Sequence, residues 1–127
     1  MAGVAGTIVF TEVSWGSVKK IAAVCTSGTG DYINTVTGTT TYPYGGKVIG
    51  VGTIPGTAGD APTDNYDVYI KDSGGHDILL GAGKNRDTAN TEYITETSVA
   101  GTYESKLVFL VENMGESNKT TVIIWIR

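Results

Sequence analysis

Short runs of β-branched and aromatic residues, separated by clusters of glycine, asparagine, aspartate and serine, recur along the whole chain. No apolar pattern with a helical period persists for three turns. Runs of this kind form strands, and the clusters between them form turns because glycine and asparagine tolerate positive φ. The pattern predicts an all-β domain, either a single β-sandwich or a jelly-roll-like barrel of about 8 antiparallel strands.

The expected strands are Thr7–Val13, Val18–Thr26, Ile33–Thr37, Gly46–Ile54, Tyr66–Lys71, Asp77–Leu80, Glu92–Thr97, Lys106–Glu112 and Thr120–Ile126. The chain has 127 residues, of which 40% are hydrophobic and 17% are charged. That length and composition are enough to bury a core, so we expect one domain spanning residues 1–127. Residues 1–6, MAGVAG, form a candidate flexible N-terminal arm.

The last two expected strands carry apolar side chains on both faces. In the first of these strands, Val108 and Leu110 point to one face, and the apolar residues that alternate with them point to the other. In the second strand, Ile123 and Trp125 alternate with apolar residues in the same way. A short turn joins the strands, so we expect them to pair and to form one apolar patch from these four residues, a candidate interface. Covering the patch is worth roughly 6–12 kcal/mol, comparable with the stability of a whole domain. The expected cover is the Ser27–Gly45 segment, the second sheet or another copy of the chain.

The sequence offers few groups for catalysis. His76 is the only histidine, and its neighbours Ser73 and Asp77 belong to an expected hairpin turn, where serine and aspartate are common. Cys25 is the only cysteine, so it has no intramolecular disulfide partner and is expected to be a small apolar core residue. We therefore expect that the protein is not an enzyme.

Aspartates cluster in the middle of the chain and raise the question of a calcium site: Asp60, Asp64, Asp67, Asp72 and Asp77. The stretch DAPTDNYD could supply Asp60, Asp64 and the Asn65 amide, but the spacing is not that of an EF-hand, and Asx turns explain the same residues. The later stretch GAGKNRDT lacks the first glycine and the Ser or Thr of a phosphate-binding loop. We expect no cofactor and no metal ion.

Six aromatic side chains could form a sugar-binding platform: Tyr42, Tyr44, Tyr66, Tyr69, Trp15 and Trp125. The interpretation we favour is that Tyr66 belongs to the core and that Tyr42-Pro43-Tyr44 packs a loop onto the domain.

The formal net charge is −4, and the longest basic run is Lys19-Lys20. Nucleic-acid binding usually needs a basic patch, so we expect no nucleic-acid partner. No apolar segment is long enough to span a membrane, and MAGVAGTIVF lacks the features of a signal peptide. The expected place of synthesis is a cytoplasm.

Several motifs from Val13 onward give the chain a resemblance to known proteins: GSVKKI, YPYGGKVI, APTDNYDV, DILLGAGKNRDTANTE and a final strand that ends on an arginine. With these motifs the chain resembles a group of small proteins encoded in tailed-bacteriophage and prophage genomes. The resemblance implies a virion structural protein without catalytic residues.

Together with the two-faced strands, the resemblance leads us to expect a capsid decoration (cement) protein located in the virion. Its expected partners are further copies of itself, with a trimer as one form, and the major capsid protein or another virion protein. The alternatives are a tail or head–tail connector component and a carbohydrate-binding module on a tail fibre.

Overall fold

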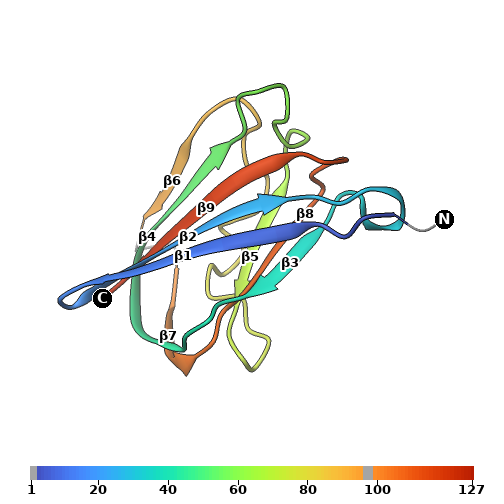
Figure 1. Ribbon diagram of the computed structural model, residues 1–127. Helices are drawn as coiled ribbons and strands as arrows, with labels where there is room; N and C mark the ends of the chain where they lie inside the picture. The colour runs from blue at the N-terminus through green and yellow to red at the C-terminus, as the bar shows by residue number, and fades with distance from the viewer. Residues whose placement is uncertain (1–2, 96–98) are drawn as a thin grey trace.

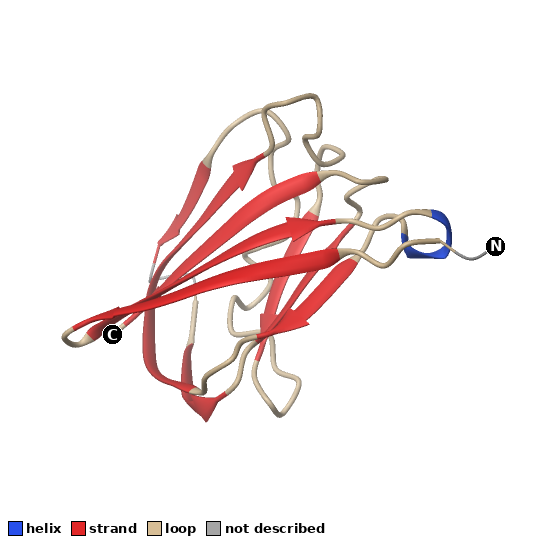
Figure 2. Ribbon diagram, in the orientation of Figure 1, coloured by secondary structure: helices blue, strands red, loops and turns tan. Residues whose placement is uncertain are grey.

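The computed structural model describes residues 3–95 and 99–127 and consists of two antiparallel sheets that pack as a β-sandwich (Figure 1). Apart from one turn of 3₁₀ helix, η1 (Gly30–Tyr32), the regular structure of these residues is strand (Figure 2). The predicted all-β class is confirmed.

The large sheet has the strand order β1-β2-β9-β4-β6, and β7 pairs with β4 beside β6. Its strands are β1 (Thr7–Trp15), β2 (Val18–Thr26), β4 (Tyr44–Pro55), β6 (Glu92–Thr95), β7 (Gly101–Ser105) and β9 (Lys119–Ile126). The C-terminal strand β9 therefore lies in the middle of the sheet, between β2 and β4, where its backbone is paired along both edges.

The small sheet has the order β3-β8-β5, with strands β3 (Val36–Thr39), β8 (Val108–Glu112) and β5 (Asp67–Lys71). The outer edge of β5 is occupied by the loop that follows it. Val68 donates its backbone N–H to Gly83, Ile78 donates to Ile70, and Tyr66 and Arg86 form an antiparallel bridge.

The core lies between the two sheets and follows from the alternation of each strand. On β9, Val122, Ile124 and Ile126 point inward and are fully buried. The rings of Phe10 on β1 and Phe109 on β8 meet edge to face, with 5.3 Å between their centroids. Such aromatic contacts add to the burial of apolar area that holds the layers together.

The predicted strand Asp77–Leu80 is wrong, because only a single bridge, Lys71 to Asp77, pairs there. The Asp77 carboxylate accepts hydrogen bonds from the backbone N–H groups of Ile70, Leu79 and Gly81, which folds the segment into successive turns. Aspartate side chains compete in this way with strand ladders.

Other predicted boundaries differ in smaller ways. The expected strand Ile33–Thr37 corresponds to β3, which begins three residues later than expected. Strand β7 was not predicted at all. The expected Lys106–Glu112 strand is β8, which begins at Val108. Residues 96 and 97 of the expected Glu92–Thr97 strand lie outside the described residues.

The connection from β8 to β9 is a crossover between the two sheets, so the predicted pairing of these strands is wrong. Met114, in the middle of the connection, is fully buried; its backbone N–H donates to the carbonyl of Asn34, which precedes β3, and its carbonyl accepts from the Thr63 N–H. At the end of the connection that leads into β9, the side-chain amide of Asn118 donates a hydrogen bond to the Met114 carbonyl at 2.7 Å.

The described part of the expected N-terminal arm lies against the β2–β3 connection. The Val4 N–H donates to the Thr29 hydroxyl, and the Thr29 N–H donates to the Val4 carbonyl, both at 2.9 Å. Within the described residues, no helix is long and apolar enough to cross a membrane.

Candidate functional site

The four residues of the predicted interface are divided between the two sheets. Val108 and Leu110 belong to β8 in the small sheet, whereas Ile123 and Trp125 belong to β9 in the large sheet. All four point away from the core and are half-buried. The predicted single patch is therefore wrong, because the crossover places the two pairs on opposite outer faces of the sandwich.

On the small sheet, polar side chains surround Val108 and Leu110. The register places Leu110 beside Tyr69, and Val108 beside Lys71. The Lys71 ammonium lies 5.8 Å from the centre of the Tyr69 ring. Long amphipathic side chains of this kind cover apolar neighbours while keeping their charge in water. This face has the ordinary mixed character of a solvated sheet.

The outer face of the large sheet is different. A row at its edge, Thr7, Thr26 and Lys119, is polar, but the outward side chains near its middle are mostly apolar. The register aligns them in three rows: Val13, Lys20, Trp125 and Gly50; then Thr11, Ala22, Ile123, Gly52 and Tyr93; then Val9, Val24, Thr121 and Ile54. We call these three rows, together with Trp15 at the end of β1, the apolar sheet face.

Much of the apolar sheet face is open to solvent. The exposed fractions are 64% for Val9, 41% for Val24, 39% for Ile54, 60% for Tyr93 and 57% for Trp15. Single exposed apolar residues are ordinary, but a contiguous group of them marks an interaction surface.

Two aromatic rings flatten the β4 side of this face. A Cβ atom on Gly50 would overlap the Tyr93 hydroxyl, and a Cβ atom on Gly52 would touch the Trp125 ring at 3.7 Å. The two rings therefore lie across the glycine strand, with 6.0 Å between their centroids. The glycines explain why Trp125 is half-buried, because its ring lies against its own chain.

The charge of the apolar sheet face differs from that of the whole chain. Although the chain is acidic overall, no outward side chain in its three rows is a carboxylate. Lys20 is the charged member of these rows, and its ammonium lies 5.9 Å from the centre of the Trp15 ring, a cation–π contact. Glu12, on the same strand as Val13, points the other way and bonds to Tyr44.

The aspartates considered for calcium act as acceptors for turn N–H groups. Asp64 accepts from Thr88, Asp67 accepts from Asn85, and Asp72 accepts from Gly74. No three His, Cys, Asp or Glu side chains among the described residues lie close enough together to hold a metal ion. Of these three hydrogen bonds, the one from Gly74 to Asp72 is of the Asx-turn kind, whereas Asp64 and Asp67 bond to the loop 84–92, so local turns do not explain those two aspartates.

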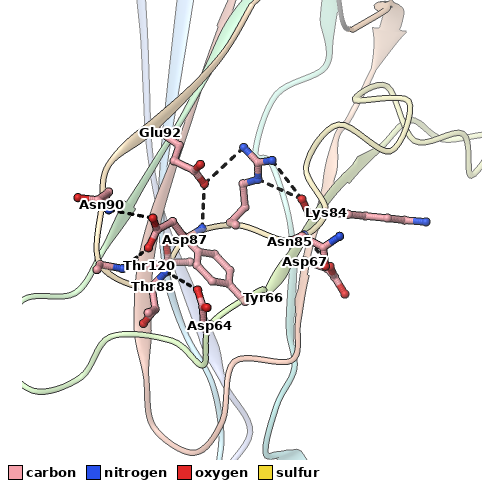
Figure 3. Close-up of polar contacts among 12 residues, drawn as sticks. Asp64, Tyr66, Asp67, Lys84, Asn85, Asp87, Thr88, Asn90, Glu92 and Thr120 are labelled. Carbon is pink, nitrogen blue, oxygen red and sulfur yellow. Dashed lines mark hydrogen bonds and ion pairs between the residues drawn. The ribbon is translucent and has the colours of Figure 1, made fainter.

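The loop 84–92 is folded by its own polar groups (Figure 3). The Arg86 guanidinium lies 3.5 Å from the Glu92 carboxylate, which also accepts the Asp87 N–H at 2.8 Å. The Asn90 amide donates to the Asp87 carboxylate at 2.8 Å. These contacts close the loop beside Tyr66 and account for its polar composition.

The His76 side chain is exposed to solvent, whereas the Cys25 side chain is buried. The His76 side chain is 82% exposed and contacts Asp72, its turn neighbour, at 3.3 Å. Cys25 is fully buried on β2, as predicted, and burial raises the pKa of its thiol to about 12. A thiol with such a pKa is scarcely ionised at neutral pH and is a poor nucleophile.

The six aromatic side chains do not form one platform. Tyr66 is fully buried, as the favoured interpretation predicted, and Tyr44 is 8% exposed with its hydroxyl on Glu12. Tyr69 lies on the outer face of the small sheet, whereas Trp125 lies on the opposite face of the sandwich.

Comparison of the chain with protein-family models, with curated proteins and with solved structures found no match. The resemblance to bacteriophage proteins therefore stays a prediction.

Sequence reasoning missed most of the apolar sheet face because it considered only the last two strands. The signal was present in TIVFTEV, where Val9 and Val13 alternate with Ile8 and Phe10, and in KKIAAVCT, where Ala22 and Val24 alternate with buried residues. What the sequence did not reveal is that β1, β2 and β9 are neighbours.

Proposed function

We propose that this chain is a bacteriophage virion structural protein, a capsid decoration protein that binds the outer surface of the head as an oligomer. The observation that carries the proposal is the apolar sheet face, a contiguous apolar surface on a folded domain. The resemblance of the motifs to bacteriophage and prophage proteins supports the same assignment.

A surface of this kind suits a part that works by assembling. Antiparallel sheets with one face in water normally carry polar residues on that face. Here valine, isoleucine, tyrosine and tryptophan outnumber the polar members of the three rows, Thr11, Thr121 and Lys20. When many copies bind a symmetric shell, modest individual contacts combine into stable attachment.

The experiment is to purify the virions of the bacteriophage or prophage that encodes the chain and to measure its copy number by quantitative mass spectrometry and cryo-electron microscopy. The proposal expects on the order of hundreds of copies, in proportion to the capsid symmetry, on the outside of the head. A ring of about six to twelve copies would instead indicate a connector component. A chain that is present in the lysate and missing from purified particles would reject the proposal.

A further inference from the structure

We propose that two copies of this chain pack face to face through their apolar sheet faces and form a two-fold symmetric dimer. The inference rests on the proposed function only in taking this dimer as the unit that assembles on the shell. It names a second copy of the chain as the occupant of the surface, and three observations favour that occupant.

The first observation is the size of the face. The three rows cover five strand positions about 4.8 Å apart and about 5 residues along each strand at 3.3 Å per residue, which is roughly 400 Å². A standard stable interface buries about 800 Å² on each partner, whereas most crystal contacts bury less than about 400 Å². The apolar sheet face therefore supplies about half of the area that a stable dimer needs, and the side chains around it must supply the rest.

The second observation is the charge of the face. Two identical faces brought together would repel each other if they carried many charges of one sign. The rows of the apolar sheet face hold no carboxylate, and their one ammonium, that of Lys20, lies against the Trp15 ring at the end of the hairpin. The acidic groups that give the chain its net charge of −4 lie elsewhere, so self-association meets little electrostatic cost.

The third observation is the shape of the face. Sheets stack about 10 Å apart when their facing side chains interdigitate. The rings of Tyr93 and Trp125 lie across Gly50 and Gly52 over β4, whereas Val9 and Val24 are exposed on β1 and β2. A two-fold axis parallel to the strands would set the β1–β2 half of one copy against the β4 half of the other, which makes an isologous interface.

The test is the mass of the purified full-length chain in sedimentation equilibrium over a concentration series. The proposal expects a mass that rises toward twice 13.3 kDa with concentration. Both tryptophans of the chain lie at this face, so their fluorescence should shift to longer wavelength on dilution, which gives a readout without any substitution.

Variants locate the interface. Val24→Lys, and separately Val9→Lys, should weaken the dimer at least tenfold, because each places a new ammonium in both copies of an apolar contact. Leu80→Lys is the matched control: Leu80 is 68% exposed, lies in a loop away from the face, and receives the same change. Circular dichroism and thermal unfolding establish that each variant is folded.

A wild-type chain that stays monomeric at millimolar concentration would overturn the inference. So would folded Val24→Lys and Val9→Lys variants that dimerise as well as the wild type, and so would a closed trimer. The proposed function has a separate outcome: a dimer in solution that is missing from virions rejects that function alone, and a monomer found on the capsid rejects the dimer alone.

Discussion

Glu12 joins the edge strand β1 to the loop that leads into β4, and replacing it with glutamine should loosen that junction. Its carboxylate accepts hydrogen bonds from the Tyr44 hydroxyl at 2.5 Å, from the Thr41 N–H at 3.0 Å and from the Tyr42 N–H at 3.3 Å. Hydrogen bonds to an ionised group contribute about 1.5–3 kcal/mol each, roughly twice a neutral bond.

The structure gives the size of the effect. In Glu12→Gln the remaining oxygen can keep the bonds from Tyr44 and Tyr42, while the Thr41 N–H loses its acceptor and turns to water. One lost bond and the lost charge together cost about 1–2 kcal/mol. The entropy of unfolding is about 0.27 kcal/mol/K for a chain of 127 residues, so the Tm should fall by about 4–7 °C.

The same contacts predict a dependence on pH. Burial alone would raise the pKa of Glu12, but the hydrogen bonds from Tyr44, Thr41 and Tyr42 outweigh it and hold the pKa below its usual 4.5. The stabilisation is therefore complete above the pKa of the unfolded chain and is lost as the pH falls through the lower folded pKa. The difference in Tm between wild type and Glu12→Gln should be largest at pH 6–7 and should shrink below about pH 4.

Differential scanning calorimetry between pH 3 and pH 7 measures this difference. Glu116→Gln, at an exposed glutamate in the β8–β9 connection, is the matched control and should change the Tm by less than about 2 °C. The reasoning is refuted if Glu12→Gln melts with the wild type at pH 7, or if its deficit is the same at pH 3. A double-mutant cycle with Tyr44→Phe should give a coupling of about 0.5–3 kcal/mol.

Three further predictions concern the core and the turns. Phe109→Ala should lower the free energy of unfolding by about 3–5 kcal/mol in urea titrations, and Leu110→Ala, on the outer face, by clearly less. Asp77→Ala leaves three backbone N–H groups without their acceptor and should cost about 1–3 kcal/mol, whereas His76→Ala, at an exposed turn residue, should change stability by less than about 0.5 kcal/mol. Cys25 should react with a thiol reagent at pH 8 only as fast as the chain unfolds, and a rapid reaction of the folded protein would contradict its burial and raised pKa.

The strand content could be predicted from the sequence because alternation is a local property. Val18–Thr26 matches β2 at both ends, and Thr120–Ile126 differs from β9 by one residue. The segment Asp77–Leu80 failed because its apolar residues suggested a strand, while the side chain of Asp77 supplied the backbone with acceptors that hold it in turns. Such a competition is decided by geometry that the residue pattern does not contain.

The pairing of strands was harder to predict than their existence. A six-residue connection between β8 and β9 suggested a hairpin, yet Met114 within it is fully buried and anchors a crossover between the sheets. Once β9 lies between β2 and β4, the partners of Ile123 become Ala22 and Gly52 and no longer include Leu110. The side chains that the alternation placed outward are indeed outward, but the patch they form has different members.

The neighbours of β9 in the large sheet also show what covers the outward side chains of this strand. Part of the cover is intramolecular, since Trp125 rests on Gly52 of β4. On an ordinary solvated sheet face, such positions carry side chains that project into water. Glycine at these positions leaves room for a large ring to lie flat across the strand. Val24 and Val9, one and two strands beyond β9, receive no such cover and stay exposed. An apolar surface that is flattened on one side and open on the other is of little use to an isolated domain, because the fold gains no core from it. Contact with a matching surface would give it a use, and the dimer that we propose would supply that surface.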